Sequence, residues 1–541
     1  MSRTPLFSLV RRSLQLAAFA SKSDTLPADE VIDRVLEGEL PGISRRRFFQ
    51  TAAAAGVVAA TPDLFTAFGQ TGGLKPRTAI IGAGIAGLNC AYKLRNAGVP
   101  VHVFEASSRS GGRMFTAKSL LAPDLTTELG GEFIDSGHEE MLRLVKEFKL
   151  GMWDFRKPSK IKAEAFFFDG RHYSEKDVVK AFVPLARKIS KDYDSLGEEV
   201  SYRVEGNGKA LDNTSIAEYL DKIGAKGWIR ELLHVAYVTE YGLEAEQQSS
   251  LNLVQMIGTD TSEGFKPFGD SDERYTVKGG NERVVVELAN RLDQGIVSLR
   301  HRLTAITAKD KGFVLTLEGP NGTAIDRDFD SVVLTLPFTM LREVDIRVPL
   351  PAVKKKAIQE LGYGTNAKVF AGFKGRPWKE RGYRGNTLSD ERFQLIWDNA
   401  ALQPGSNSGI TFYSGGKLGV EAGNGTAQEA LALLLPGLEK AYPGSTDALN
   451  GNVSRFHWPT HPFTKASYAA YLPGQWTTIG GAEGESVGNL HFAGEHTSVD
   501  FQGYMNGGAQ SGADAAKAVL ASVSAKAARL FERRPPVRRW A

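Results

Sequence analysis

The sequence predicts an α/β fold built on a parallel sheet. Residues 78–81 have the short, mostly apolar pattern of a buried strand, 86–97 have a helical pattern that ends before Gly98, and 101–104 form a second strand pattern. A strand, a helix and a strand in this order form a βαβ unit, whose two strands are parallel. Strand-rich and helix-rich segments then alternate along the rest of the chain, as an α/β protein requires.

Composition indicates a large globular protein and excludes several classes. The 541 residues are 42% hydrophobic, which is enough for a sizeable core. Lys and Arg number 66 against 62 Asp and Glu, so the net charge of +4 gives no sign of a nucleic-acid partner. The one cysteine, Cys90, excludes a disulfide framework, an iron–sulfur cluster and a cysteine-ligated zinc site. The apolar run at 52–60 is too short for a transmembrane span, which needs about 20 residues.

The two ends of the chain are expected to lie outside the folded part of the protein. Residues 1–74 are predicted to be a leader and linker, and 524–541 a basic tail. The segment 44–50 (SRRRFFQ) resembles a bacterial twin-arginine export signal, which predicts a periplasmic or secreted protein. The alternative is a solvated basic turn before an alanine-rich helix, and a signal that is not used would leave the protein in the cytoplasm.

The middle of the chain contains further strand and helix patterns. Strands are predicted at 297–306, 313–317 and 332–336, and helices at 178–200 and 216–237.

A glycine-rich loop between the first strand and the first helix predicts a dinucleotide site. The motif at 82–87 (GAGIAG) allows a tight turn, close approach to a pyrophosphate and close packing of helix on strand. Glu105 ends the second strand 23 residues after Gly82, where a carboxylate can accept hydrogen bonds from ribose hydroxyls. The alternative is an ordinary glycine-rich turn with Glu105 as a solvated strand end.

Four later motifs extend this interpretation. They are 110–113 (SGGR), 128–134 (ELGGEFI), 489–495 (NLHFAGE) and 501–509 (FQGYMNGGA). With the loop at 82–87 they resemble, in the same order, the flavin-containing amine oxidase superfamily, which includes monoamine oxidases and L-amino-acid oxidases. Each could alone be a common turn or a strand–turn–helix unit, but five independent matches in order are improbable.

The resemblance implies a two-domain flavin amine oxidase fold over about 75–523, with a Rossmann-like FAD-binding domain and a substrate domain of mixed sheet and helices. The FAD-binding domain would be discontinuous, and the pieces between its segments would form the substrate domain. The FAD-binding segments would be 75–137, 272–345 and 447–523, and the substrate segments 138–271 and 346–446.

The resemblance also implies which residues bind the cofactor. FAD would be noncovalent, because Ser467 stands where the monoamine oxidases have the cysteine that is bonded to the flavin. The FAD-binding residues would be Gly82, Gly84, Ile85, Ala86, Gly87, Glu105, Ala106, Gly112, Arg113, Gly130, Gly131, Glu132, Phe133, Trp458, Gly494, Glu495, Gly503, Tyr504 and Met505.

Three residues match positions that act on the substrate in this family. Lys368, in 364–370 (GTNAKVF), matches a lysine that sits through one water beside the flavin and assists oxygen reduction. Tyr468 and Tyr504 match two tyrosines that form an aromatic cage for the amine. The alternatives are an exposed strand lysine and two tyrosines that only fill the core.

The resemblance implies oxidation of an amine to an imine, which water hydrolyses to an aldehyde and ammonia, while oxygen becomes hydrogen peroxide. The alternative is an L-amino-acid oxidase or dehydrogenase that gives a 2-oxo acid, basic amino acids included. Several L-amino-acid oxidases carry an arginine where this chain has Phe133, which favours a plain amine. Arg274 or Arg392 could still bind a carboxylate, and Glu132 could bind a second cationic group of the substrate.

Other interpretations remain open at this stage. The same architecture occurs without FAD in dissociation inhibitors of prenylated GTPases, and with FAD in carotenoid and porphyrinogen oxidases. His457 and His461 have the spacing of a helical zinc pair, but Pro459 between them prevents a helix that would hold both on one face, so no metal site is expected. The expected partners are a small amine or amino acid and oxygen, and the oligomeric state stays open, a homodimer included.

Overall fold

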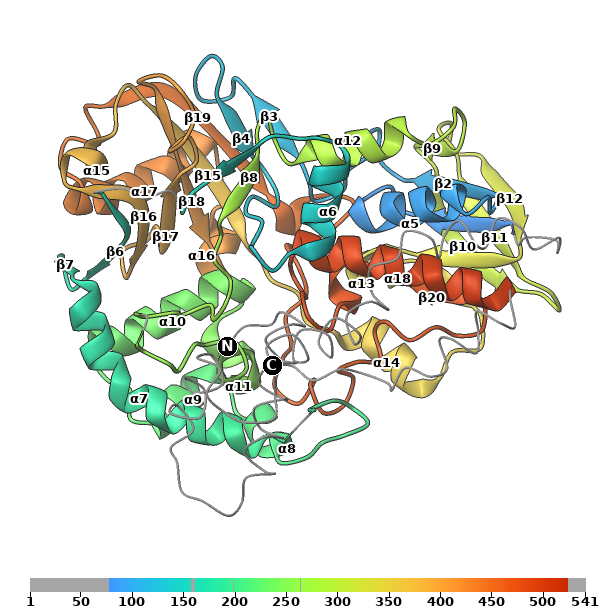
Figure 1. The fold of residues 1–541 in the computed structure, drawn as a ribbon, viewed down its shortest axis with the longest axis horizontal. Helices are drawn as coiled ribbons and strands as arrows, with labels where there is room; N and C mark the ends of the chain where they lie inside the picture. Colours follow the sequence, from blue (N-terminus) through green and yellow to red (C-terminus); the bar gives the residue numbers. More distant parts are fainter. Residues whose placement is uncertain (1–76, 157–160, 198, 263, 524–541) are drawn as a thin grey trace, which may run out of the picture. The chain divides into compact units, whose positions relative to one another are not determined.

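The computed structural model describes residues 77–156, 161–197, 199–262 and 264–523, which belong to one compact unit (Figure 1). The predicted leader at 1–74, with its twin-arginine motif, and the predicted basic tail at 524–541 lie outside the described residues.

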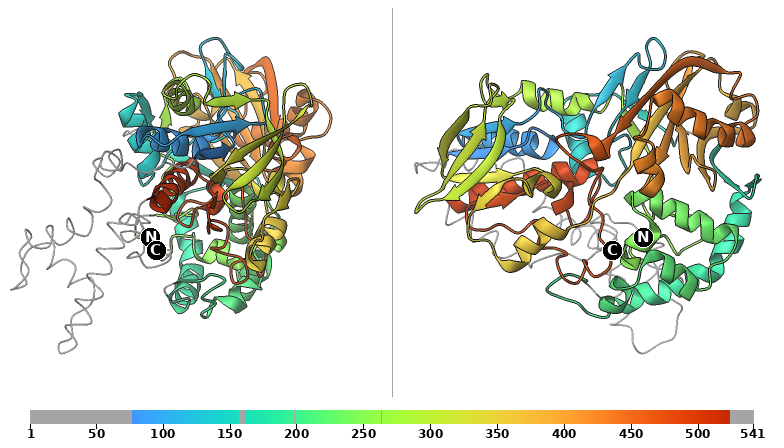
Figure 2. Two further views of the ribbon diagram at one scale, coloured as in Figure 1. Left: turned by 90° about the vertical axis from the view of Figure 1, so that its right-hand side faces the viewer. Right: turned by 180° about the vertical axis from the view of Figure 1, so that it is seen from behind.

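A five-stranded parallel sheet forms the first half of this unit and confirms the predicted fold class. Its strand order is β20 (Leu490–Phe492), β13 (Ser331–Leu334), β1 (Thr78–Ile81), β2 (Val101–Glu105) and β9 (Val297–Leu299). Helix α5 (Ile85–Asn96) connects β1 to β2, as the βαβ pattern predicts. The C-terminal helix α18 (Met505–Val523) packs along α5, and Figure 2 shows the two side by side from behind as well.

A seven-stranded mixed sheet forms the second half. Its order is β19 (Leu449–His457), β15 (Ala367–Phe373), β18 (Ser408–Ser414), β17 (Leu395–Asp398), β16 (Tyr383–Ser389), β6 (Lys162–Phe168) and β7 (Arg171–Tyr173). The helix α17 (Ala427–Ala441) packs on one face through an apolar cluster. Strand β19 lies in the predicted FAD-binding segment 447–523 but pairs with β15, so this segment begins with a strand of the other sheet. The division into domains stays a prediction.

Three smaller sheets complete the strands. One has the order β12 (Ala324–Phe329), β11 (Phe313–Glu318), β10 (Arg302–Ala308) and β14 (Asp345–Arg347), and the others pair β3 (Thr116–Lys118) with β4 (Thr126–Glu128) and β5 (Met152–Asp154) with β8 (Tyr275–Val277). The single strand predicted at 297–306 is wrong. Arg300 takes a left-handed φ of 59°, which ends β9 and sends β10 into a different sheet.

Helices between β7 and β8 form the rest of the second half. They are α7 (Glu175–Ser195), α8 (Gly208–Asp212), α9 (Ile216–Lys222), α10 (Trp228–Tyr241) and α11 (Ser250–Val254). A capping box of Ser174 and Asp177 starts α7 three residues before the predicted helix. The predicted helix 216–237 is instead two helices, because Gly224 at φ 76° follows the end of α9 and Gly227 at φ 62° precedes α10.

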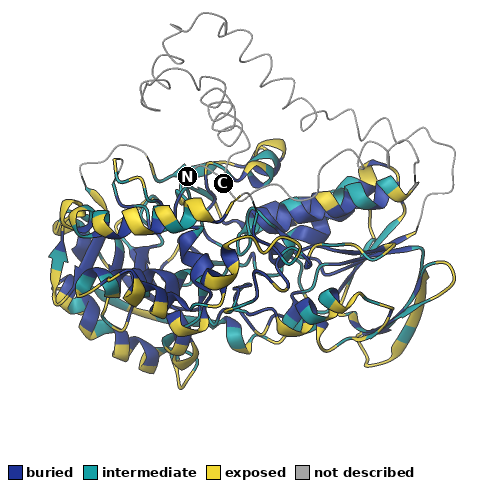
Figure 3. Ribbon diagram, turned by 90° about the horizontal axis from the view of Figure 1, so that it is seen from below, coloured by how far each residue is buried: buried dark blue, intermediate teal, exposed yellow. Residues whose placement is uncertain are grey.

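The remaining helices are short connections, apart from α6 and α12 beside the parallel sheet. They are α6 (Glu139–Glu147), α12 (Glu282–Asn290), α13 (Phe338–Leu341), α14 (Ala352–Glu360), α15 (Pro377–Glu380), α16 (Gly416–Glu421) and the 3-10 turns Ala245–Gln247, Trp458–Thr460 and Glu495–Thr497. Within the described ranges, no helix combines the length and the apolar character needed to cross a membrane. Figure 3 shows the buried residues gathered in the sheets and on the inner helix faces.

Candidate active site

One large cavity of about 330 Å³ collects the residues that the sequence motifs predict. The predicted residues that line it are Gly82, Gly84, Ile85, Ala86, Glu105, Ala106, Gly112, Arg113, Gly130, Gly131, Glu132, Phe133, Lys368, Trp458, Tyr468, Gly494, Glu495, Gly503, Tyr504 and Met505. Among the predicted site residues, Gly87 alone is absent from this lining. Motifs that lie more than 400 residues apart in the sequence therefore meet at one site.

The glycines of the first loop are required by close contacts. A Cβ on Gly82, at φ 108°, would lie 2.5 Å from Oγ1 of Thr335. A Cβ on Gly87 would lie 1.9 Å from the carbonyl oxygen of Gly82. Gly87 therefore supports the site from outside the cavity, because it lets α5 pack directly on the loop.

The start of α5 and the end of β2 suit a dinucleotide. Gly84 caps α5 without a side-chain hydrogen bond, and the first turn has no acidic residue, so its N–H groups can bind a phosphate. The Glu105 carboxylate is oriented by two backbone donors, the N–H of Ala83 at 2.7 Å and that of Ser107 at 2.8 Å. It ends β2 at the cavity wall, where it can also accept from ribose hydroxyls.

Arg113 joins three distant motifs at the centre of the cavity. Its Nη1 donates to Oε1 of Glu495 at 2.7 Å and to the carbonyl oxygen of Ser467 at 2.8 Å. The other oxygen of Glu495 accepts from the N–H of Gly503 at 2.8 Å. The arginine is thus neutralised by its partner and held in place.

Gly130 and Gly131 form a flat wall of backbone. A Cβ on Gly130 would lie 1.8 Å from the carbonyl oxygen of Arg113, and one on Gly131 would lie 2.7 Å from Cγ of Met505. The indole Nε1 of Trp458 donates to the carbonyl oxygen of Leu129 at 3.0 Å and fixes the segment from the other side. Backbone packed in this way can lie against a planar ring.

Lys368 is buried in the cavity wall, so the alternative of an exposed strand lysine is wrong. Its Nζ donates to the carbonyl oxygens of Gly130 at 2.9 Å and Glu128 at 3.1 Å, and to Oε2 of Glu132 at 2.9 Å. Oε1 of Glu132 accepts from Nε1 of Trp397 at 2.8 Å. Both oxygens of Glu132 are therefore occupied, which argues against the hypothesis that this residue binds a second substrate cation.

The two predicted tyrosines are tied to one glutamate at the end of α10. The hydroxyl of Tyr504 donates to Oε1 of Glu240 at 3.0 Å, and that of Tyr468 donates to the carbonyl oxygen of the same residue. Tyr468 and Tyr413 also share a hydrogen bond of 2.8 Å. Burial raises the pKa of Tyr468 and of Tyr504 well above the usual range, so both hydroxyls stay protonated.

Sequence reasoning missed Glu240, Glu273, Trp397 and Tyr413, all of which line the cavity. None of them belongs to a motif, and each comes from a segment that the motifs do not cover. The only available signal is that Trp397 and Tyr413 stand in alternating strand patterns, which says nothing about the wall they face.

Comparison with known proteins identifies a family whose match spans most of these motifs. Residues 85–520 match the family described as flavin containing amine oxidoreductase. The chain belongs to this family. Its flavin cofactor and its activity as an amine oxidoreductase follow from that membership, and its fold agrees with that of solved members.

Relatives within the family differ in their substrates. The chain is 24% identical over 473 residues to an L-amino acid dehydrogenase of Synechocystis sp., covering 82% of this chain and 94% of that protein. It is 24% identical over 456 residues to the (S)-6-hydroxynicotine oxidase of Paenarthrobacter nicotinovorans, covering 82% and 99%. The structure of cyclohexylamine oxidase from Brevibacterium oxydans superposes with a TM-score of 0.73 at 23% identity, covering 85% and 100%.

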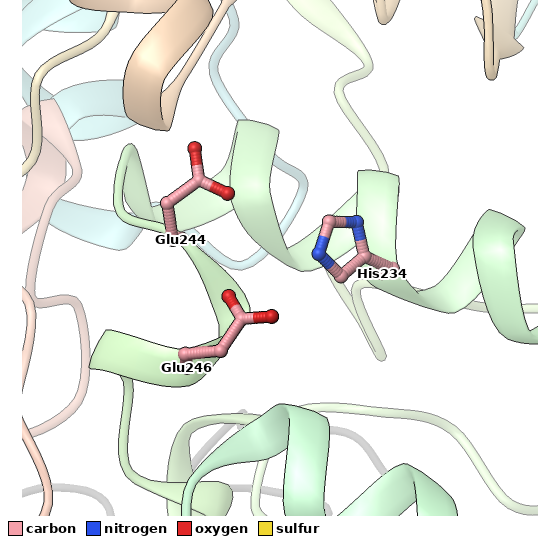
Figure 4. Close-up of side chains that lie close together, drawn as sticks. All are labelled: His234, Glu244 and Glu246. Atoms are coloured by element: carbon pink, nitrogen blue, oxygen red, sulfur yellow. The ribbon is translucent and has the colours of Figure 1, made fainter.

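Outside the cavity, one group of side chains has the composition of a metal site. Figure 4 shows His234, Glu244 and Glu246, whose ligand atoms lie within 4.8 Å of one another. Oε1 of Glu244 already accepts from the backbone N–H of Lys417 at 2.7 Å, and Glu246 is exposed. This surface group therefore serves the local turn and lies apart from the flavoenzyme's cavity.

The histidine pair considered from the sequence has other partners. The ring of His457 contacts Oγ1 of Thr460 at 2.9 Å and the carbonyl oxygen of Gly419 at 3.1 Å. The ring of His461 contacts Oγ1 of Thr464 at 3.1 Å.

Proposed function

We propose that this chain oxidises a plain amine, rather than an α-amino acid, to an imine with noncovalently bound FAD, and that oxygen becomes hydrogen peroxide. The observation that carries this proposal is the pairing of every lysine and arginine that lines the cavity. An α-amino acid needs a cation for its carboxylate, and a cation that already pairs with a carboxylate of the protein is less available to bind one.

The cations of the cavity wall each have a carboxylate partner. The pairs are Arg109 with Glu282 at 3.4 Å, Arg113 with Glu495 at 2.7 Å, Arg302 with Glu343 at 3.4 Å and Lys368 with Glu132 at 2.9 Å. The two arginines that the sequence left as candidates are paired as well, Arg274 with Asp154 at 3.1 Å and Arg392 with Glu421 at 2.7 Å, and neither lines the cavity. The cavity wall thus offers no unpaired lysine or arginine that could bind the carboxylate of an α-amino acid.

The lining residues fit FAD, as the glycine contacts and the uncapped start of α5 show. When bound, FAD supplies the redox chemistry: it accepts a hydride equivalent from the carbon next to the amine nitrogen and passes the electrons to oxygen. Glu105 would bind the adenosine ribose, the start of α5 the pyrophosphate, and Gly130, Gly131 and Met505 would lie along the ring.

The protein's own contribution is to position a neutral amine. Tyr468 and Tyr504 are fixed through Glu240, so their rings are held before the substrate arrives. A Cβ on Gly503 would make an ordinary contact with the Tyr468 ring at 3.4 Å, and it is the φ of 88° that favours glycine beside this ring. Burial among aromatic rings lowers the pKa of a bound amine and favours the uncharged form, which is the form that can lose a hydride.

Noncovalent binding is supported by Ser467 and Cys90. Oγ of Ser467 donates to Oδ1 of Asn366 at 2.6 Å and has no thiol chemistry to offer. Cys90 is the only cysteine and is buried on α5, away from the cavity lining. We expect acid precipitation of the holoenzyme to release all the flavin into the supernatant, and flavin retained in the pellet would contradict this.

The experiment that tests the reaction is an anaerobic titration that follows flavin absorbance near about 450 nm. We expect amines to bleach the flavin and neutral L-amino acids to leave it oxidised. Bleaching by L-amino acids alone would favour the second candidate, an L-amino-acid dehydrogenase or oxidase, which the similarity to the Synechocystis enzyme supports. Admission of air to the bleached enzyme, followed by a peroxide assay, tests oxygen as the acceptor.

We also propose export through the twin-arginine pathway, which rests on Arg45 and Arg46 in the 44–50 segment. The Arg45→Lys, Arg46→Lys double variant should retain the protein in the cytoplasm of a host that has this pathway. Unchanged export of that variant would contradict the signal.

A further inference from the structure

The substrate end of the cavity holds more carboxylates than cations. Asp135, Glu240 and Glu273 line it together with Tyr468 and Tyr504. Lys368, which lines the flavin end, is committed to Glu132 at 2.9 Å. Of these carboxylates, Asp135 and Glu273 form no ion pair with a lysine or arginine among the described residues.

Two of these three carboxylates are occupied by neighbours. Asp135 contacts Nε2 of His138 at 3.3 Å and accepts from the backbone N–H of Glu273 at 2.9 Å. Glu240 accepts from the hydroxyl of Tyr504 at 3.0 Å.

Glu273 differs from both. Within the described part of the chain, no group donates a hydrogen bond to its carboxylate and no cation pairs with it. Its side chain is exposed, yet desolvation by the surrounding protein raises the pKa of its carboxyl well above the usual range. A side chain can be both exposed to solvent and surrounded by protein when it lies on a concave surface. This agrees with the position of Glu273 in the cavity wall.

The surroundings of Glu273 make its negative charge costly. The charges of Asp135, Glu240, Glu164 and Glu132 all disfavour its ionisation. In turn, the charge of Glu273 is one of the causes that raise the pKa of Tyr413, which is hydrogen-bonded to Tyr468. The carboxylate thus stands within electrostatic reach of the tyrosines that would hold the reacting amine, and a cation placed beside it would relieve the repulsion.

We propose that Glu273, with Glu240 nearby, binds a second cationic group of the substrate, so that the preferred substrates are diamines or longer polyamines. This inference rests on the proposed function and names its substrate class. One amino group reacts between Tyr468 and Tyr504, and the distal ammonium forms an ion pair with the Glu273 carboxylate.

The wall near these carboxylates suits the chain that joins two amino groups. The rings of Phe133 and Trp397 lie 5.8 Å apart, and those of Trp397 and Tyr413 lie 5.4 Å apart. Aromatic faces of this kind pack against methylene groups and also attract an ammonium group. A dication with an apolar middle matches this wall better than a short monoamine does.

The test compares the holoenzyme with its Glu273→Gln variant on butylamine and 1,4-diaminobutane, together with diamines of three and five carbons. We expect the wild type to favour a diamine over the monoamine of equal length by roughly 10- to 100-fold in kcat/KM, mostly through KM. The variant should lose this preference, because its kcat/KM should fall far more for 1,4-diaminobutane than for butylamine. Flavin content and melting temperature show that both proteins are folded.

A matched control is Glu421→Gln, which removes an exposed carboxylate that pairs with Arg392 outside the cavity. Its diamine preference should equal that of the wild type. If the control also lost the preference, overall charge rather than Glu273 would be responsible, and the assignment would be overturned.

The outcomes separate this inference from the proposed function. Equal kcat/KM for butylamine and 1,4-diaminobutane in the wild type, a comparison that needs no variant, overturns the inference and leaves amine oxidation standing. A diamine preference that persists in Glu273→Gln overturns the role of Glu273. Turnover of L-lysine or L-arginine, but not of amines, that falls in Glu273→Gln upholds a second-cation site and overturns the plain-amine proposal.

Discussion

The two ends of the cavity treat charge in opposite ways. Around Arg113 and Lys368, each cation is held by a buried or half-buried carboxylate at 2.7–2.9 Å. At the substrate end, by contrast, Glu273 has neither a cation nor a hydrogen-bond donor as a partner within the part of the chain that the structure describes. The difference teaches that the flavin end is electrostatically complete in the protein itself, whereas the substrate end becomes complete only when a cation binds.

The largest effect is expected when the Lys368–Glu132 ion pair at the flavin end is broken. Lys368→Met leaves the Glu132 carboxylate buried without its cation, which should lower the free energy of unfolding by about 3–5 kcal/mol. Turnover should fall as well, because Lys368 lines the cavity. Denaturant unfolding of the two proteins measures the first effect. The double variant Lys368→Met, Glu132→Gln should recover part of the loss, and no recovery would contradict the pairing argument.

The next effect concerns the loop that carries the flavin end. In Gly87→Ala, the new Cβ would lie 1.9 Å from the carbonyl oxygen of Gly82, so α5 must move away from the loop. We expect a loss of about 3 kcal/mol in unfolding free energy and a fall in bound flavin. Gly375→Ala is the control, since nothing lies within 4 Å of its Cβ. Equal flavin content in the two variants would argue against the packing role of Gly87.

A smaller effect is expected at the substrate end, where the preference for a diamine should depend on pH. The raised pKa of Glu273 means that this carboxyl ionises, and can pair with a cation, only as pH rises above the ordinary carboxyl range. The ratio of kcat/KM for 1,4-diaminobutane to that for butylamine should therefore rise with pH until the distal ammonium loses its proton near about 10. Loss of the reacting amine's own proton affects both substrates and cancels in the ratio.

The same ratio in Glu273→Gln should stay flat over this ascending range. The other groups that act on Glu273 are Glu132, Asp135, Glu164 and Glu240. A rising ratio that survived in the variant would assign the titration to one of these carboxyls instead.

The parts of the fold that the sequence predicted are those set by local contacts. The βαβ unit and the loop at 82–87 follow from residues close in sequence, so strand, glycine and helix patterns suffice. The two wrong predictions, a single strand at 297–306 and a single helix at 216–237, both fail where the backbone takes a positive φ, at Arg300 and at Gly224 and Gly227. The spacing of apolar residues does not reveal where the backbone takes a positive φ and a helix or strand ends.

In the candidate site, too, the residues that lie in local sequence motifs were predicted, whereas contacts between distant segments were not. Motif residues around the flavin end could be found, because each motif carries its own glycines and charges. Lys368 was found in the same way, but its ion pair with Glu132 was not, since the two residues lie 236 residues apart on different elements. Glu240 and Glu273 likewise reach the cavity only through the packing of α10 and of the segment before β8.

The measurement that tests the account most directly is anaerobic reduction of the enzyme-bound flavin by three matched compounds. Butylamine has one amino group, 1,4-diaminobutane adds the distal cation, and L-ornithine adds an α-carboxylate to that diamine. We expect 1,4-diaminobutane to reduce the flavin at the lowest concentration, butylamine at a higher one, and L-ornithine poorly, because each cation that lines the cavity is already paired. Reduction by L-ornithine alone would contradict the assignment of a plain amine as the substrate.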